Sequence, residues 1–265
     1  MVQEKICDAH LHLVQCSKKM DFASFNGFQS YFACTCAHEE NEFYEQAKIC
    51  KILPDKLGKK CSLNFAQSFG IHPQMPLLKN AGFLEKLLQE EKIDAIGEAG
   101  FDLFTQELKN QLDAQEIVWR IQLELAIKYK KPLVVHCRKA LQYIYRDAAL
   151  LKKVPSVLFH SFCGGIYEAK GILSKGINAY FSFGTQLLKG NKKSAECVKL
   201  LPLSCLLFET DAPFQTLKHE FFTNPLDVKN VYKKAFEIRY PEKKLELSEF
   251  CNEIFNTFLN CFKIC

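Results

Sequence analysis

The chain has 265 residues, of which 48% are hydrophobic and 25% are charged, and its formal net charge is +5. This composition can build a full hydrophobic core, and no apolar run approaches the roughly 20 residues that a membrane span needs. The mild positive charge permits a polyanionic substrate without requiring one. The segment MVQEKICDAHLHL is charged and has no apolar h-region, so we expect no secretory signal and a cytoplasmic protein.

Short apolar runs alternate with longer amphipathic stretches along the whole chain. The strand-like runs are, in order, KICDAHL, QSYFACTC, LNFAQSFGIH, IDAIGEAG, PLVVH, SVLFH, NAYFSFG and CLLFET. Helical spacing of apolar residues predicts helices near 39–53, 82–91, 106–130, 138–151, 165–174, 191–200 and 225–238, which opens with Pro225. A last helix is expected from Ser248, as its N-cap, to about Phe262.

This alternation is typical of βα units with a parallel sheet. Eight strands in about 250 residues match the size of a TIM barrel. We therefore predict an α/β fold, a (β/α)8 TIM barrel, in which residues 1–265 form a single domain.

The thirteen cysteines are scattered and often lie inside apolar runs, which is typical of reduced thiols used as small hydrophobes. Cys34 and Cys36 would lie on the same face of a strand. A structural zinc would need two more soft ligands nearby, and none is obvious, so we expect both to be core residues.

Metal-binding types of side chain fall where the strand-like runs end. They are His10 and His12 in the first run, Glu98 in the fourth, His136 in the fifth, His160 in the sixth and Asp211 after the eighth. In a TIM barrel the C-terminal strand ends form one rim. We therefore expect these six side chains to converge at the mouth of the barrel.

Imidazoles and carboxylates in this arrangement suit a pair of divalent ions. His10 and His12 are two residues apart on a strand, so they can chelate one ion together. Glu98 can bridge two ions, and His136 and His160 can hold the second. Two ions about 3.5–4 Å apart can clamp a phosphoryl group and lower the pKa of a bound water from about 15.7 toward 7.

Asp211 and Glu98 are the predicted catalytic residues, with Asp211 accepting the proton of the attacking water. One histidine at a strand end is usually structural, and the HxH pattern alone recurs by chance. Six such residues at barrel strand ends are hard to produce by chance. His72 ends the third run on the same rim, whereas His38 and His219 lie in loop-like sequence and receive no role.

The chain resembles the TatD-related metal-dependent deoxyribonucleases, within the wider amidohydrolase-like barrels. The matching segments are ICDAHLHL, FGIHPQ, AIGEAGFDL, PLVVHCRKA, FHSFCGG, YFSFGTQLL, FETDAPF and TNPLDVKNV, in the family's order from residue 6 to about 231. The resemblance implies hydrolysis of DNA phosphodiester bonds with two metal ions. It implies a first ion at His10, His12, Glu98 and Asp211, and a second at Glu98, His136 and His160.

The resemblance also suggests substrate contacts for His72 and Arg138. The chain departs from the family pattern at Lys139, where the family has an acid, and in residues 215–223, which hold one lysine and no arginine. Imidazole ligands suit Zn, Mn, Co or Fe better than Mg alone, so the identity of the ions stays open. DNA is the expected partner, with no membrane, no obligate protein partner and a monomeric state.

Two other functions fit the same residues. One is hydrolysis of a different ester or amide, such as a small-molecule or aminoacyl-tRNA ester, because an activated water attacks carbonyl carbon as readily as phosphorus. The other is a non-enzymatic binding module on a retained barrel. Several phenylalanines near the rim should mostly pack in the core, while one or two could stack on bases. They are Phe101, Phe104, Phe162, Phe181, Phe183 and Phe214.

Overall fold

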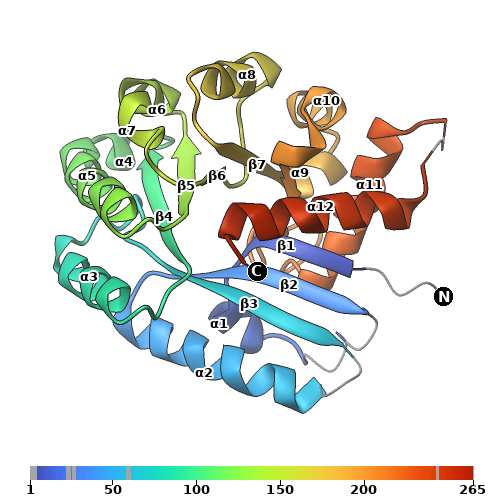
Figure 1. Ribbon diagram of the computed structural model, residues 1–265, viewed down its shortest axis with the longest axis horizontal. Helices are drawn as coiled ribbons and strands as arrows, with labels where there is room; N and C mark the ends of the chain where they lie inside the picture. The colour runs from blue at the N-terminus through green and yellow to red at the C-terminus, as the bar shows by residue number, and fades with distance from the viewer. Residues whose placement is uncertain (1–4, 22–24, 26–27, 58–60, 243–244, 265) are drawn as a thin grey trace.

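Eight parallel strands form one sheet in chain order, from β1 to β8 (Figure 1). The computed structural model describes residues 5–21, 25, 28–57, 61–242 and 245–264. The strands are β1 (Lys5–Leu11), β2 (Ser30–Ala37), β3 (Ser62–Phe69), β4 (Ala95–Asp102), β5 (Leu133–Arg138), β6 (Val157–Phe159), β7 (Ala179–Phe183) and β8 (Leu206–Phe208).

The two ends of the sheet meet just beyond β8. The Asp211 N–H donates to the His10 carbonyl over 3.0 Å, and the His12 N–H donates to the Ala212 carbonyl over 2.8 Å. These bonds join the segment after β8 to the end of β1. The predicted (β/α)8 barrel is therefore confirmed.

Helices surround the strands on the outside of the barrel (Figure 1). The longer ones are α2 (Glu40–Leu57), α3 (Ala81–Gln89), α5 (Leu112–Lys128), α8 (Ile166–Ser174), α10 (Lys192–Leu200), α11 (Val228–Arg239) and α12 (Leu247–Phe262). The shorter ones are α1 (Leu13–Ser17), α4 (Gln106–Lys109), α6 (Leu141–Arg146), α7 (Ala148–Leu151) and α9 (Thr185–Leu188). None of the described helices has the length and apolarity to cross a membrane.

Two predicted helices are each divided in the structure. The stretch 106–130 forms α4 and α5, and 138–151 forms α6 and α7. At the first division the Gln115 amide donates to the carbonyls of Leu108 (2.8 Å) and Asp102 (3.1 Å). A side chain thus satisfies a carbonyl where the helix stops, which local apolar spacing does not reveal. The short helices α1 and α9 were not predicted.

The helix ends also differ from the prediction. Glu246, rather than Ser248, is the N-cap of α12, because the extended backbone ends there (φ −81°, ψ 144°) and Ser248 already lies in the first turn. The helix α2 continues through Pro54 to Leu57. Before α11, the 3-10 turn Pro225–Asp227 starts with proline, as expected, and the Asn224 side chain accepts a bond from Leu226 N–H (2.9 Å).

The core changes character toward the C-terminal ends of the strands. Apolar residues fill most of it, but buried polar side chains gather at the mouth, including Asp8, His10, Glu98, Asp102 and Glu209. Charged groups are rarely buried unless they are paired or bind a metal. Of the six rim phenylalanines, four are buried, and the two with large exposed fractions are Phe104 (45%) and Phe214 (49%).

Candidate metal centre

Glu98 lies at the centre of the barrel mouth because β4 is irregular at this point. The sequence predicted that Glu98 ends its strand, but β4 continues to Asp102. The pairing with β5 shifts register between Ile96 and Ala99. A bulge of this kind redirects a side chain. A Cβ at Gly97 would lie 2.6 Å from the Val134 Cβ, so the bend needs glycine.

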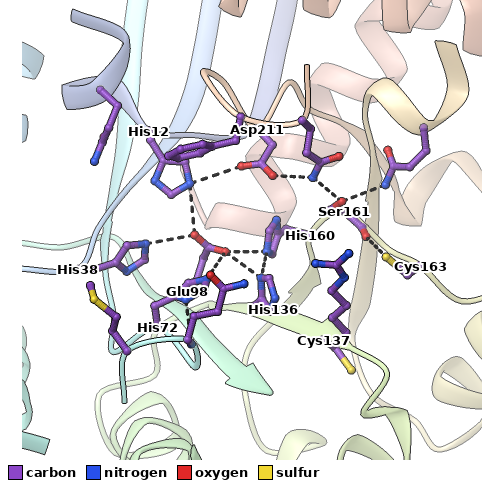
Figure 2. Close-up of a pocket in the computed structure, with 17 residues that line it drawn as sticks. His12, His38, His72, Glu98, His136, Cys137, His160, Ser161, Cys163 and Asp211 are labelled. Carbon is purple, nitrogen blue, oxygen red and sulfur yellow. Dashed lines mark hydrogen bonds and ion pairs between the residues drawn. The ribbon is translucent and has the colours of Figure 1, made fainter. Parts of the chain in front are cut away.

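Imidazoles surround both oxygens of the Glu98 carboxylate (Figure 2). The Oε1 atom is 3.3 Å from His10 Nε2, 3.4 Å from His12 Nε2 and 3.2 Å from His38 Nε2. The Oε2 atom faces His160 Nε2 at 2.7 Å, His136 Nδ1 at 3.3 Å and His72 Nε2 at 3.4 Å. Six imidazoles from the ends of five strands (β1, β2, β3, β5 and β6) therefore converge on one buried carboxylate.

The first predicted ligand group has the spacing of a metal site. The nitrogens of His10 and His12 are 3.3 Å apart, and Asp211 Oδ1 lies 3.6 and 3.4 Å from them. Ligand atoms about 2.0–2.2 Å from a common zinc-like ion lie about 3–3.5 Å from one another. These three residues, all buried, could hold a cation.

The second group lies on the other side of Glu98. The His136 Nδ1 and His160 Nε2 atoms are 3.1 Å apart, and both lie close to Glu98 Oε2. The opposite nitrogen of His136, Nε2, is 3.1 Å from the buried carboxylate of Asp102. A carboxylate behind a histidine places the proton on the far nitrogen and leaves the near lone pair for a metal.

His160 and His10 also have a side chain close to the ring nitrogen that faces away from Glu98. Glu209 Oε1 lies 3.8 Å from His160 Nδ1, and both buried atoms lack a closer hydrogen-bond partner among the described residues. The Ser182 hydroxyl donates to the other Glu209 oxygen. Glu209 therefore lies behind His160, on the side away from Glu98. Cys36 Sγ lies 3.3 Å from His10 Nδ1, so this predicted core thiol lies directly behind a ligand candidate.

Hydrogen bonds from distant residues position Asp211. Asp8 on β1 accepts bonds from Thr210 N–H (2.9 Å) and the Thr210 hydroxyl (2.6 Å) and from the Tyr31 hydroxyl (3.1 Å). This contact holds the segment after β8 against β1. The amide of Gln215 donates to Asp211 Oδ2 over 2.5 Å. One carboxylate oxygen therefore faces the histidines while the other is held by Gln215.

Two buried glutamines of α5 hold the loops at the mouth. Gln122 accepts a bond from the Ile71 N–H (2.7 Å) and donates to its carbonyl (3.1 Å), next to His72. Gln115 accepts a bond from the Asp102 N–H over 2.9 Å. The outer helix α5 thus fixes the backbone at Asp102 and next to His72.

Burial and charge shift the pKa values of the cluster in different directions. Burial by itself would raise the pKa of Glu98, but the surrounding imidazoles outweigh it and hold the pKa well below its usual range. Burial would lower the pKa of His160, yet Glu98 and Glu209 keep it well above the ordinary value. Burial dominates at His10, whose pKa is lowered, and lowers the pKa of His72 to about 4.

The cluster opens into a cavity of about 650 Å³, which is the size of a small-ligand site. Among the described lining residues Arg138 is the one lysine or arginine, and glutamine amides contribute much of the remaining rim. The Arg138 guanidinium stacks 3.5 Å from the Phe104 ring centroid. Phe214 lies edge-on to His12, with 5.0 Å between ring centroids.

The structure brings all eight sequence-predicted site residues to this cavity or its floor. His38, to which the sequence assigned no role, also reaches Glu98. It follows β2 directly, in the position that marks the other candidates, but the run QSYFACTC ends before it. His219 is exposed. Three further residues of the site, Gln215, Asp102 and Glu209, are identified by their contacts with the candidate ligands in the structure.

The donor set fits divalent metal ions. Neutral imidazole and carboxylate are the usual ligands of Zn and of Mn, Fe or Co. So many lone pairs and negative oxygens at about 3.3 Å, with little water access, would repel one another without a cation or protons between them. The buried cluster could therefore bind metal ions.

Comparison with known proteins gives consistent matches. The family described as "TatD related DNase" matches residues 7–260. An "Uncharacterized metal-dependent hydrolase" of Buchnera aphidicola subsp. Baizongia pistaciae is 34% identical over 161 residues, 58% of this chain. The "3'-5' ssDNA/RNA exonuclease TatD" of Pantoea sp. is 31% identical over 55% of the chain, and human "3'-5' RNA nuclease TATDN2" is 28% identical over 80%. The matches span 58%, 56% and 29% of these relatives' lengths.

Solved structures show the same fold. The TatD homologue YJJV from Escherichia coli superposes with a TM-score of 0.77 at 22% identity, covering 98% of both chains. A TatD family hydrolase from Entamoeba histolytica gives a TM-score of 0.73 at 20% identity, covering 98% of this chain and 99% of its own. Because the family match extends over nearly the whole chain, this protein belongs to the TatD-related DNase family.

Proposed function

We propose that the protein is a divalent-metal-dependent nuclease that hydrolyses DNA phosphodiester bonds. The observation that carries this proposal is the convergence of four histidines with Glu98 and Asp211 at the floor of one cavity, in a chain of this family. In this proposal two ions bind, the first at His10, His12, Glu98 and Asp211 and the second at Glu98, His136 and His160.

Bound ions would polarise the phosphodiester and lower the pKa of water at the site. The protein's own contribution begins with Asp211, a buried carboxylate. Burial would raise the pKa of Asp211, but the neighbouring imidazoles outweigh this effect and lower it. Asp211 accepts the proton of the attacking water. Gln215 holds the far oxygen of Asp211, so the carboxylate keeps one orientation while the proton moves.

His72 contributes a hydrogen-bond donor to the substrate. Its Nδ1 accepts the Gln74 N–H over 3.1 Å, so the ring proton lies on Nε2, which faces the site. With a pKa of about 4 the ring is neutral at working pH. His72 would therefore donate to a phosphate oxygen. Arg138, braced by Phe104, supplies the positive charge for the same phosphate.

The rim of the cavity favours a short or single-stranded segment of nucleic acid over a long duplex. Among the described lining residues it offers one permanent positive charge, whereas duplex binding usually uses many phosphate contacts. The exposed rings of Phe104 and Phe214 offer surfaces on which unpaired bases can stack. One relative is named a 3'-5' ssDNA/RNA exonuclease and another a 3'-5' RNA nuclease, and the first of these names agrees with this substrate.

We further propose that residues 1–265 act as one monomeric unit in the cytoplasm. The continuous eight-strand sheet supports a single unit, and cysteines scattered inside apolar runs are typical of a reducing compartment.

The test is a substrate panel with purified protein and Mn²⁺ or Mg²⁺. Labelled single-stranded and duplex DNA should be degraded, the single strand faster, and Asp211→Asn should abolish the activity. Asp113→Asn, on the exposed face of α5, is the matched control and should retain activity. Activity that survives chelation would overturn the metal mechanism. Cleavage of RNA or carboxylic esters but not DNA, dependent on Asp211, would replace the DNA substrate by one of those.

A further inference from the structure

His38 is held in one orientation at the edge of the histidine cluster. It directly follows β2, and its backbone N–H donates to Glu42 on α2 over 2.7 Å. Its carbonyl accepts a bond from the Asn80 side chain over 2.9 Å. The side chain is 14% exposed and points toward Glu98, as Figure 2 shows. Contacts from two neighbouring segments therefore fix this residue.

The two ring nitrogens of His38 have different partners. Nδ1 lies 3.2 Å from the carbonyl oxygen of Gly70, which can only accept a hydrogen bond. The proton of the neutral ring must therefore lie on Nδ1. In this tautomer the lone pair on Nε2 faces Glu98 Oε1 at 3.2 Å, an approach that only a proton or a cation between the two atoms stabilises.

His72, which faces the other oxygen of the Glu98 carboxylate, shows the reverse arrangement. Its Nδ1 accepts a backbone N–H, so its Nε2 carries the proton and donates toward the site. The two histidines are neighbours, with 5.0 Å between ring centroids, yet one presents a donor and the other a lone pair. A lone pair directed at a carboxylate, with the other nitrogen bound to a carbonyl, is the arrangement of a metal-ligating histidine.

His12 completes a group around this lone pair. One ring nitrogen each of His12 and His38 and one oxygen of Glu98 all lie within 4.8 Å of one another. His12 Nε2 is 3.4 Å from Glu98 Oε1, similar to the 3.2 Å of His38. Two imidazole lone pairs and a carboxylate oxygen thus share one small space, which a divalent cation would stabilise.

We propose that His38 is a further metal ligand, which binds the first of the two proposed ions together with His12 and Glu98. This inference rests on the proposed metal centre and adds a seventh protein ligand to it. It assigns His38 and His72 opposite tasks, because His38 would coordinate a cation whereas His72 would donate to substrate.

Metal binding to purified variants tests this assignment. Apo protein is titrated with Zn²⁺ by calorimetry and with Co²⁺ by its visible absorption, and bound metal is counted by mass spectrometry. His38→Gln should lose one equivalent of metal or bind its weakest ion about 10-fold or more weakly, since even residues behind a ligand cost 10–100-fold. Its Co²⁺ spectrum should also change. His219→Gln, at an exposed histidine, is the matched control and should bind as the wild type does.

A measurement on the unmodified protein covers the case in which His38→Gln fails to fold. In ¹⁵N-histidine-labelled protein, Zn²⁺ should shift the Nε2 resonance of His38 while Nδ1 keeps its proton. A His38 resonance that does not respond to Zn²⁺, or a folded His38→Gln protein with wild-type stoichiometry, affinity and Co²⁺ spectrum, would overturn the inference alone. Wild-type protein that takes up no divalent metal would overturn the proposed function as well.

Discussion

Replacing Asp102 with asparagine should weaken metal binding from behind the site. Asp102 is fully buried, and all its partners are donors: His136 Nε2 at 3.1 Å and the Gln74 amide at 2.7 Å on Oδ2, and the Phe104 N–H at 2.9 Å on Oδ1. Burial would raise the pKa of Asp102, but these bonds outweigh it and lower the pKa to about 2. The group is therefore a carboxylate at every working pH.

An asparagine at position 102 cannot satisfy these donors, because one end of its amide is itself a donor. If the NH₂ group faces His136, the imidazole must move its proton to Nδ1 and lose the lone pair that faces Glu98. If it faces Phe104, two N–H groups meet in a buried space. Residues in this position typically change metal affinity 10–100-fold, which is about 1.4–2.7 kcal/mol. We expect Asp102→Asn to lower the affinity for the more weakly bound ion by this factor.

The assay is competitive metal titration of apo protein with a chromophoric chelator, with thermal unfolding measured in parallel. The matched control is Asp147→Asn, because Asp147 is also buried and accepts bonds from Trp119 (2.8 Å) and Arg120 (3.1 Å). That control should lose stability and keep its metal affinity. Metal affinities of Asp102→Asn within twofold of the wild type would refute the argument that Asp102 sets the protonation of His136.

Three further expectations concern acid, the catalytic carboxylate and the rim. The pKa of His160 is raised and that of His10 is lowered, so as the pH falls protons should displace the ion at His160 before the ion at His10, and bound metal should leave in two steps. Gln215→Leu removes the bond that orients Asp211 and should lower kcat about 10-fold with little change in KM, measured on a DNA oligonucleotide. Phe104→Leu removes a cation–π contact of about 0.5–1 kcal/mol and should raise KM about 2–5-fold.

Each of these expectations has its own control. In His136→Ala the early step of metal release should disappear, and its persistence would contradict the assignment of that step. Gln186 donates to Ser161 (3.0 Å) as Gln215 does, but no described bond joins it to Asp211, so Gln186→Leu should affect kcat less. Phe104→Tyr keeps the aromatic face and should keep the wild-type KM; an increase as large as that of Phe104→Leu would rule out stacking as the cause.

The barrel could be predicted because its signal is local and repeated. Each apolar run, such as PLVVH or SVLFH, is long enough to show a strand and ends at a polar residue. Eight repeats in one chain leave few other architectures. The helices were less predictable, as at 106–130, because the break depends on Gln115 reaching the carbonyl of Leu108, and apolar spacing carries no record of that bond.

The candidate ligands could be named from the sequence for the same reason. His10, His136 and His160 lie in or directly after strand-like runs, and the barrel turns strand ends into one rim. Glu98 shows the limit of this reasoning. It was expected at a strand end but lies within β4, and a shift in register directs it to the centre.

Chain order and strand-end position were therefore enough to identify the fold and a set of ligand candidates. The direction of each lone pair required the tertiary structure. His38 and His72 are the same residue type in similar loops, yet the Gly70 carbonyl fixes the proton of one ring and the Gln74 N–H fixes that of the other. A single hydrogen bond to one ring nitrogen thus decides whether the other nitrogen offers a lone pair to a cation or an N–H to an acceptor. The Gly70 carbonyl reaches His38 only because folding brings the ends of β2 and β3 together.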